Sequence, residues 1–449
     1  MTPGVNELED FGYEQQLRRS LSTRDLVVYG MIFMVPIAPY GVFGFVWHDA
    51  KGMVPLAYLI GLIGMFFTAM SYATMSRAFP VAGSVYAYAQ RGIHEIAGFF
   101  SGWLILLDYI LVPALIYMFN SVALRPMFPH VPQWIWLGGF IVFNAAVNLL
   151  GMHLTARVNW YMLAIELLSL ALFIGVGIAA LYSGAGAGRL TLLPIYDPRV
   201  FSLATAAGAT SIAVLSFLGF DGISTLSEES RGGRDSVGRA TIWALLLAGA
   251  MFMIQTWIAS DLARGMHFSS LATAFYEVAG AAGGPWLRNS AILASVIGGI
   301  ANAMVAQAAV SRILFAMARD GKLPGVLARI HPRYQTPYVS TLAVAALSLV
   351  VGLVFGQRID DLSRIVNFGA LSGFLLLHLS VIIHFFVRGR SGRWIRHLLF
   401  PLAGFLVIAY VIYEMDRSAK VLGATWICIG AVYYLLLTFV LKKTPALEL

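Results

Sequence analysis

The chain has 449 residues, of which 59% are hydrophobic and 12% charged, and its mean hydropathy is +0.78. Soluble domains carry about 25% charged residues, so this composition excludes a soluble globular protein and indicates a polytopic membrane protein. The single cysteine, Cys428, excludes an intramolecular disulfide, and no motif implies a metal or a cofactor.

Twelve apolar runs, each long enough to cross a membrane as a helix, follow one another along the chain. They fall at about 25–47, 54–78, 96–122, 133–152, 158–182, 201–227, 239–260, 287–316, 338–356, 362–386, 396–415 and 422–441. We expect no cleavable signal before them, because the first 22 residues contain four acids and no apolar segment.

Two of the runs are interrupted. The first contains VPIAPYGVFG (Val35 to Gly44), and the sixth contains SFLGFDGISTLSEES (Ser216 to Ser230). Backbone groups in hydrocarbon must be hydrogen-bonded, so an opened turn at this depth has to line a protein cavity or water. Two broken helices in corresponding places point to the central site of a transporter. A proline kink is the plainer explanation for the first interruption taken alone.

The interruptions divide the chain into two halves. Spans one to five (23–183) and six to ten (201–386) each open with a broken helix, and an odd number of spans per half inverts the second half relative to the first. Spans eleven and twelve (394–441) are then peripheral, and 1–22 and 442–449 are terminal segments. We expect residues 261–286 to form an external loop with a short amphipathic helix, either a lid or a surface connector.

Six strings carry a family resemblance. They are RAFPVAGSVYAYAQ (Arg77 to Gln90), GWLILLDY (Gly102 to Tyr109), SFLGFDGISTLSEES, VSRILFAMARDGKLP (Val310 to Pro324), HPRYQTP (His331 to Pro337) and VNFGALSGF (Val366 to Phe374). Together they resemble the amino acid–polyamine–organocation (APC) superfamily, and within it the bacterial putrescine importers.

The resemblance implies an all-α membrane protein of twelve transmembrane helices. Its fold would be a LeuT-like 5+5 inverted repeat with broken first and sixth helices plus two peripheral helices. It also implies alternating access and proton-coupled uptake. The sequence contains no HExxH, Walker A or GxSxG motif, so no enzyme motif competes with this interpretation.

The first interruption provides four candidate substrate-binding residues, Ala38, Pro39, Tyr40 and Gly41. Many amino-acid-specific relatives have a glycine-rich run here whose N–H groups, at a helix N-terminus, take the substrate carboxylate. In this chain Pro36 and Pro39 have no N–H. The two prolines therefore argue against an α-carboxylate as the main group by which the substrate is bound.

The second interruption places Asp221 between Gly219 and Gly222. A half-helix that ends here presents carbonyl oxygens and a negative dipole end, which suits an ammonium group. A charged residue at membrane depth is functional by default, although capping of the broken helix is the alternative. Phe217, Phe220 and Tyr40 are candidates for cation–π contact with an amine, or else for ordinary core packing.

Four further residues complete the candidate site. By the resemblance, Tyr109 lines the substrate path, and Asp108 beside it has either a functional or a structural role. Glu166 falls where many relatives have a lysine that substitutes for a bound sodium ion. An acid here is a candidate proton acceptor, because burial disfavours the charged form; a Glu paired with a nearby polar group is the alternative. Asn302 either contacts substrate or bridges helices.

These observations predict a secondary carrier of small amines, with putrescine or a related polyamine as first choice. Alternatives are a permease or exchanger for neutral or cationic amino acids and, more remotely, a channel-like or sensory protein on a carrier scaffold. The expected partners are the substrate, protons and membrane lipid. The expected location is a bacterial-type cytoplasmic membrane.

The lysines and arginines predict the topology. Twenty of the thirty fall on the side of the N-terminus, and the positive-inside rule places that side in the cytoplasm. The net charge of +8 is therefore explained by topology, without a nucleic-acid partner. Because an even number of spans returns the chain to the same side, a periplasm-only reporter fused after Leu449 should stay inactive. Strong activity of that fusion would contradict the prediction.

Overall fold

The computed structural model describes residues 21–79, 84–150, 156–231, 234–319, 323–334, 336–356 and 358–440. Most of the expected N-terminal segment 1–22 and the whole tail 442–449 lie outside these residues. Within the described ranges, the protein is all-helical, with no β-pairing other than an isolated parallel bridge between Leu21 and Ser230.

Fourteen α-helices form in the described part of the chain. Their bounds are α1 Thr23–Met34, α2 Pro39–Asp49, α3 Val54–Ala78, α4 Ser84–Gly92, α5 Glu95–Ala123, α6 Gln133–Leu149, α7 Ala156–Tyr182, α8 Leu203–Ala213, α9 Arg234–Leu262, α10 Ala274–Arg319, α11 Tyr338–Phe355, α12 Ile359–Val381, α13 Phe400–Glu414 and α14 Arg417–Leu435. The 3₁₀ segments are η2 Val214–Phe217, η3 Phe220–Glu229, η4 Leu271–Thr273 and η5 Gly325–Ala328. Three π-helical turns extend α-helices, η6 Ile382–Arg388, η7 Ile395–Leu399 and η8 Leu436–Val440.

Nine helices in the described ranges are long and apolar enough to cross a membrane, or ten if the bent pair α1 and α2 counts as one span. Two of the twelve predicted runs, 133–152 and 201–227, correspond to shorter apolar helices, Gln133–Leu149 and Leu203–Phe217. The run at 287–316 is part of α10, which begins earlier, at Ala274, and is kinked at Gly284. The short helix expected within 261–286 is the first part of that element.

Local chemistry explains where the helices begin and end. Ser22 caps α1: its hydroxyl accepts from the Asp25 N–H (3.3 Å), and the Asp25 carboxylate accepts from the Ser22 N–H (2.8 Å). This reciprocal pair satisfies two backbone donors that a helix start leaves unpaired. Pro39 is the first residue of α2, where its missing N–H costs nothing.

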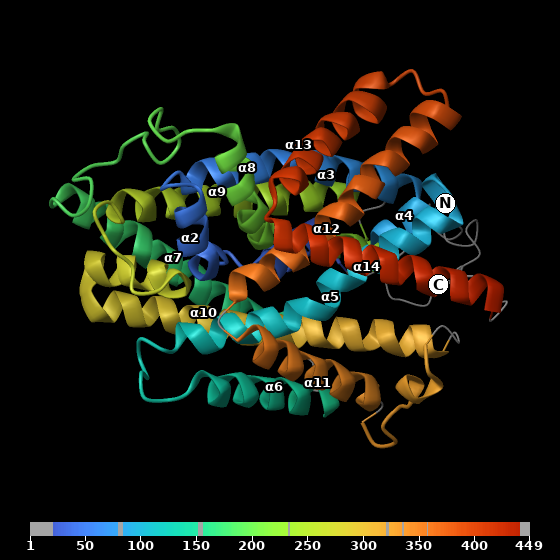
Figure 1. Ribbon diagram of the computed structural model, residues 1–449, viewed down its shortest axis with the longest axis horizontal. Coiled ribbons are helices and arrows are strands. Elements are labelled where there is room, and N and C mark those ends of the chain that lie inside the picture. Colours follow the sequence, from blue (N-terminus) through green and yellow to red (C-terminus); the bar gives the residue numbers. More distant parts are fainter. Residues whose placement is uncertain are drawn as a thin grey trace.

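The helices pack into one bundle (Figure 1). The pair α3 and α9 and the pair α5 and α12 pack along each other, and α10 packs against both α5 and α7. In Figure 1, α6 and α11 lie side by side at one edge, next to α10. The last two helices, α13 and α14, pack on α12.

The segment Leu271–Gly283 lies directly on α2. A Cβ added to Gly44 would come within 2.1 Å of the Leu271 carbonyl oxygen and 2.7 Å of the Ala274 Cβ. Only glycine allows this approach, because real Cβ atoms do not come that near a backbone oxygen. The tight contact fixes the second half of the first broken helix beneath this segment.

Gly44→Ala should therefore destabilise the protein by about 1–3 kcal/mol, the usual cost of overpacking. Gly139→Ala is the matched control, because Gly139 lies within α6 and a Cβ there meets nothing within 4 Å. The control should be neutral or gain about 0.5–1 kcal/mol, since alanine suits a helix interior better than glycine. Thermal unfolding in detergent measures both, and equal melting temperatures for the two variants would contradict the contact.

Candidate functional site

The first helix breaks at Val35–Ala38. The axes of α1 and α2 meet there at 57°. The N–H groups that begin the second half are used locally: Ala38 donates to the Val35 carbonyl (2.7 Å), Tyr40 to Ile37 (2.9 Å) and Gly41 to Ala38 (3.3 Å). Since Pro36 and Pro39 have no N–H, this helix N-terminus offers an anion few donors.

The break is held from two neighbouring helices. The Gln255 side chain on α9 donates from Nε2 to the Pro36 carbonyl (2.9 Å). The Asn302 side chain on α10 donates from Nδ2 to the Phe33 carbonyl (3.5 Å). Both partners are carbonyls that a continuous helix would pair internally, so the two amides replace the missing helical bonds.

The second break follows α8 and η2. Gly219 has φ +107, and a Cβ there would lie 2.9 Å from the Phe33 carbonyl oxygen, so the position requires glycine for both its conformation and its space. This contact brings the two breaks together. The Gly219 N–H donates to Asp221 Oδ1 (3.3 Å), and the Tyr72 hydroxyl also lies against this carboxylate.

A cavity of about 170 Å³ lies between the two breaks, well above the ~10–15 Å³ that one water needs. Its walls come from the two breaks, α2, α5 and α10. Seven residues that the sequence singled out line it: Ala38, Gly41, Asp108, Tyr109, Gly219, Asp221 and Asn302. Pro39, Tyr40, Phe217, Phe220 and Glu166 are not among its lining residues.

The three candidate aromatic side chains are packed in the protein core. Tyr40 stacks on Phe275 with ring centroids 3.8 Å apart. Phe217 packs on Tyr58, and Phe220 on Tyr72. Each of the three is 1% exposed or less, so in this conformation they do not form a cage around the cavity.

The charged residues that line the cavity are all acidic. Asp108 and Asp221 both line it, and no Lys, Arg or His is among the described lining residues. Asp108 Oδ1 is buried without a hydrogen-bond partner in the described structure. Two carboxyl groups in a pocket without any other charged residue on its described walls favour a cationic ligand, because burying unpaired anions is costly.

Glu166 is buried beside the cavity. It reaches from α7 to α10, where its Oε1 would lie 2.1 Å from a Cβ on Gly298, and its side chain is only 4% exposed. The next glycine, Gly299, lines the cavity and accommodates Asn120 from α5 in the same way. Glu166 Oε2 has no hydrogen-bond partner among the described residues. Within the described ranges, no cluster of three potential metal ligands forms.

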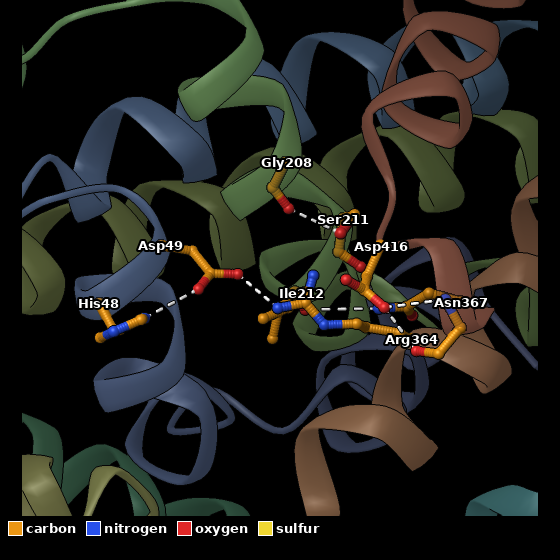
Figure 2. Close-up of polar contacts among 9 residues, drawn as sticks. His48, Asp49, Gly208, Ser211, Ile212, Arg364, Asn367 and Asp416 are labelled. Atoms are coloured by element: carbon orange, nitrogen blue, oxygen red, sulfur yellow. Dashed lines mark hydrogen bonds and ion pairs between the residues drawn. The ribbon is translucent and has the colours of Figure 1, made fainter. Parts of the chain in front are cut away.

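Polar contacts tie α2, α8 and α12 together away from the cavity (Figure 2). Arg364 on α12 pairs with Asp49 at the end of α2. Asn367, one turn further along α12, donates to the Ser211 carbonyl of α8 (2.7 Å). Through these bonds α12 contacts a half of each broken helix, α2 and α8.

Asp416, before α14, lies beside Arg364 in Figure 2. The Ser418 hydroxyl, and then the Ser418 N–H (2.9 Å), donate to its carboxylate and hold the pKa of Asp416 below its ordinary value. The Asp416 carboxylate therefore keeps its negative charge beside Arg364.

Sequence reasoning missed several residues of this site. Asn120, Ser216, Tyr276 and Ser295 line the cavity, and Gln255 holds the first break. The signal available for Gln255 was a lone amide in an apolar run, which marks a helix bridge without naming the partner.

The family follows from the whole chain. The model of the amino acid permease family matches residues 30–415, which include both breaks and every cavity-lining residue. The chain belongs to the amino acid permease family. This family lies within the APC superfamily, as the resemblance predicted, and it consists of transporters, not enzymes.

Two named relatives match this chain over nearly its full length, and a third matches most of it. The low-affinity putrescine importer PlaP of Escherichia coli (strain K12) is 30% identical over 443 residues, 96% of this chain and 95% of the relative. The branched-chain amino acid permease BcaP of Bacillus subtilis (strain 168) is 26% identical over 449 residues, 94% of each. Cationic amino acid transporter 4 of Mus musculus is 28% identical over 409 residues, 84% of this chain and 62% of the relative. This permease is thus an integral membrane transporter of amines or amino acids.

Proposed function

We propose that this permease imports a small organic amine, putrescine or a related polyamine, by secondary active transport. The observation that carries the proposal is the pairing of two carboxyl groups with an N–H-poor helix break in one cavity. Asp108 and Asp221 offer counter-charge to ammonium groups. The first N–H groups of α2 are already bonded to local carbonyls.

In this proposal Asp221 takes one ammonium group of the substrate. It lies in the first turn of η3, four residues after the α8–η2 half-helix ends at Phe217, and the negative dipole end of that half-helix adds to the attraction. Asp108 and the neighbouring Tyr109 hydroxyl take the second. A diamine needs counter-charge at both ends, and the apolar walls between, such as Val112 and Leu215, suit its methylene chain.

The proposed scaffold is the twelve-span, 5+5 inverted repeat with broken first and sixth helices, with spans eleven and twelve peripheral. It would sit in the bacterial cytoplasmic membrane with both termini cytoplasmic and work by alternating access. In support, the described helices follow the order of the twelve apolar runs, and the chain bends or changes conformation in runs one and six.

We propose Glu166 as the proton-coupling residue. Its carboxyl group is buried, has an unpaired oxygen and packs on Gly298, next to the cavity wall at Gly299. A carboxyl group so placed can hold a proton while the substrate site is occupied and release it when the surroundings change. Asp221 and Asp108 are the alternatives, since both are buried in the same region.

An amino acid substrate is the second candidate. It is favoured by Asn120, whose Nδ2 is buried without a hydrogen-bond partner while the residue lines the cavity. This amide is a donor that a substrate carboxylate would satisfy. Uptake of labelled putrescine, spermidine and a panel of amino acids into proteoliposomes, with and without a proton gradient, tests both candidates. Accumulation of an amino acid without any amine uptake would reject the first; a conductance without accumulation would indicate a channel.

Asp221→Asn should weaken putrescine affinity about ten- to a hundredfold, because a charge-assisted contact contributes about 1.5–3 kcal/mol and each 1.4 kcal/mol is tenfold. Gly41→Ala in the first break is the matched variant, since the atoms nearest to its Cβ belong to the Phe119 ring, the closest at 3.2 Å. If an amino acid carboxylate used the first break, Gly41→Ala would weaken binding at least as much as Asp221→Asn. Near-normal putrescine affinity in Asp221→Asn would rule out its role.

Glu166→Gln should abolish accumulation driven by a pH gradient and leave counterflow exchange measurable. Glutamine keeps the size and hydrogen bonding of Glu166 but cannot titrate. Loss of binding together with transport would show a substrate or folding role instead. Unchanged accumulation would move the coupling proton to Asp221 or Asp108.

A further inference from the structure

Gln255 is a fully buried amide two turns before the end of α9, and it is absent from the cavity lining. Its Nε2 uses both protons. One goes to the Met251 carbonyl of its own helix (2.9 Å), and the other crosses to the Pro36 carbonyl in the first break (2.9 Å). The amide is thus anchored on a continuous helix and reaches a discontinuous one.

The break that Gln255 reaches is strained. Val35 has φ +54 and ψ +100, a region that β-branched residues rarely adopt. The residue that follows it is Pro36, which has no N–H. Strained backbone persists only where its surroundings hold it in place, and the described contact that fixes the Pro36 carbonyl is the one from Gln255.

A purely structural role does not explain a glutamine at this position. Gln255 Oε1 is buried and has no hydrogen-bond partner among the described residues. A buried amide with one end unpaired is unfavourable compared with an apolar side chain of similar size. Gln307 on α10 shows the contrast, because Tyr117 and Asn148 both donate to its Oε1 (3.1 Å each) and its Nε2 donates to the Thr341 carbonyl (3.4 Å).

We infer that Gln255 is a positioning residue of the transport site: it holds the strained Val35–Pro36 turn and thereby sets the cavity wall. The neighbours of Pro36 on both sides, Val35, Ile37 and Ala38, line the cavity. Moving the Pro36 carbonyl therefore moves the wall that the substrate meets. The inference rests on the proposed function only in taking this cavity as the substrate site.

The test compares Gln255→Met with Gln307→Met. Both glutamines are fully buried, and methionine fills a similar volume in each case. Gln255→Met should bind putrescine about tenfold more weakly, which corresponds to about 1.4 kcal/mol. Gln307→Met should lower the melting temperature at least as much and leave affinity within about twofold, less than 0.6 kcal/mol by the same conversion. Equal effects of the two variants on affinity would overturn the inference.

A second readout needs no substrate. Ala38→Cys in a Cys428→Ser background places a thiol in the cavity wall, and its alkylation rate by a small maleimide reports the position of that wall. The rate should change severalfold on adding Gln255→Met and stay the same on adding Gln307→Met. An unchanged rate in both would overturn the positioning role, even if putrescine proved not to be the substrate.

The strain at Val35 allows a rescue experiment, in which a second substitution restores the affinity lost in Gln255→Met. Val35→Gly removes the conformational penalty, because glycine adopts φ +54 freely. If Gln255 acts by holding Val35, then adding Val35→Gly to Gln255→Met should recover most of the lost affinity. If the two changes instead add independently, Gln255 does not act through this turn.

Discussion

The need to pair every backbone group inside the membrane determines the structure around the cavity. A helix broken in hydrocarbon exposes carbonyl and N–H groups, each of which costs several kcal/mol if left without a partner. Here Gln255 and Asn302 pair the carbonyls of Pro36 and Phe33, and local turns pair the N–H groups of Ala38, Tyr40 and Gly41. The first break consequently keeps its shape and offers few free N–H donors to an anion.

The same requirement explains the geometry of the second break. Gly219 fits against the Phe33 carbonyl only because it has no side chain, and its N–H turns to Asp221. The acid is thus placed between the two breaks by backbone geometry. With Asp108 on α5 facing the same cavity, the arrangement favours positive charge without any contribution from the aromatic residues, which are packed elsewhere.

Much of this was predictable from the sequence. Apolar run length fixed the membrane class, and the family strings gave the family, because both signals are local and strong. Asp221 and Gly219 were identified because an acid and glycines in an apolar run are rare and costly. Tyr40, Phe217 and Phe220 were placed less well: an aromatic ring on a helix faces either core or cavity, and only packing partners such as Phe275 decide which.

Contacts between segments that are distant in the chain could not be predicted from the sequence. Gln255 lies 219 residues from Pro36, and nothing in either stretch names the other. Glu166 was recognised as an unusual acid, but its fit against Gly298 depends on the distance between α7 and α10. Two helices are also shorter than predicted, since α6 and the α8–η2 unit do not extend over the whole of their apolar runs; helix ends depend on capping and turns, which hydropathy does not record.

The central claim is that the cavity binds amino groups and that a carboxylate group on the ligand adds little to the binding free energy. Ornithine tests it most directly, because it is putrescine with one added α-carboxylate. Competition of each against labelled putrescine, measured on the purified permease, compares the two ligands at equal amine content. The account predicts that unlabelled putrescine competes at least tenfold more strongly than ornithine, or about 1.4 kcal/mol. Equal or stronger competition by ornithine would contradict it.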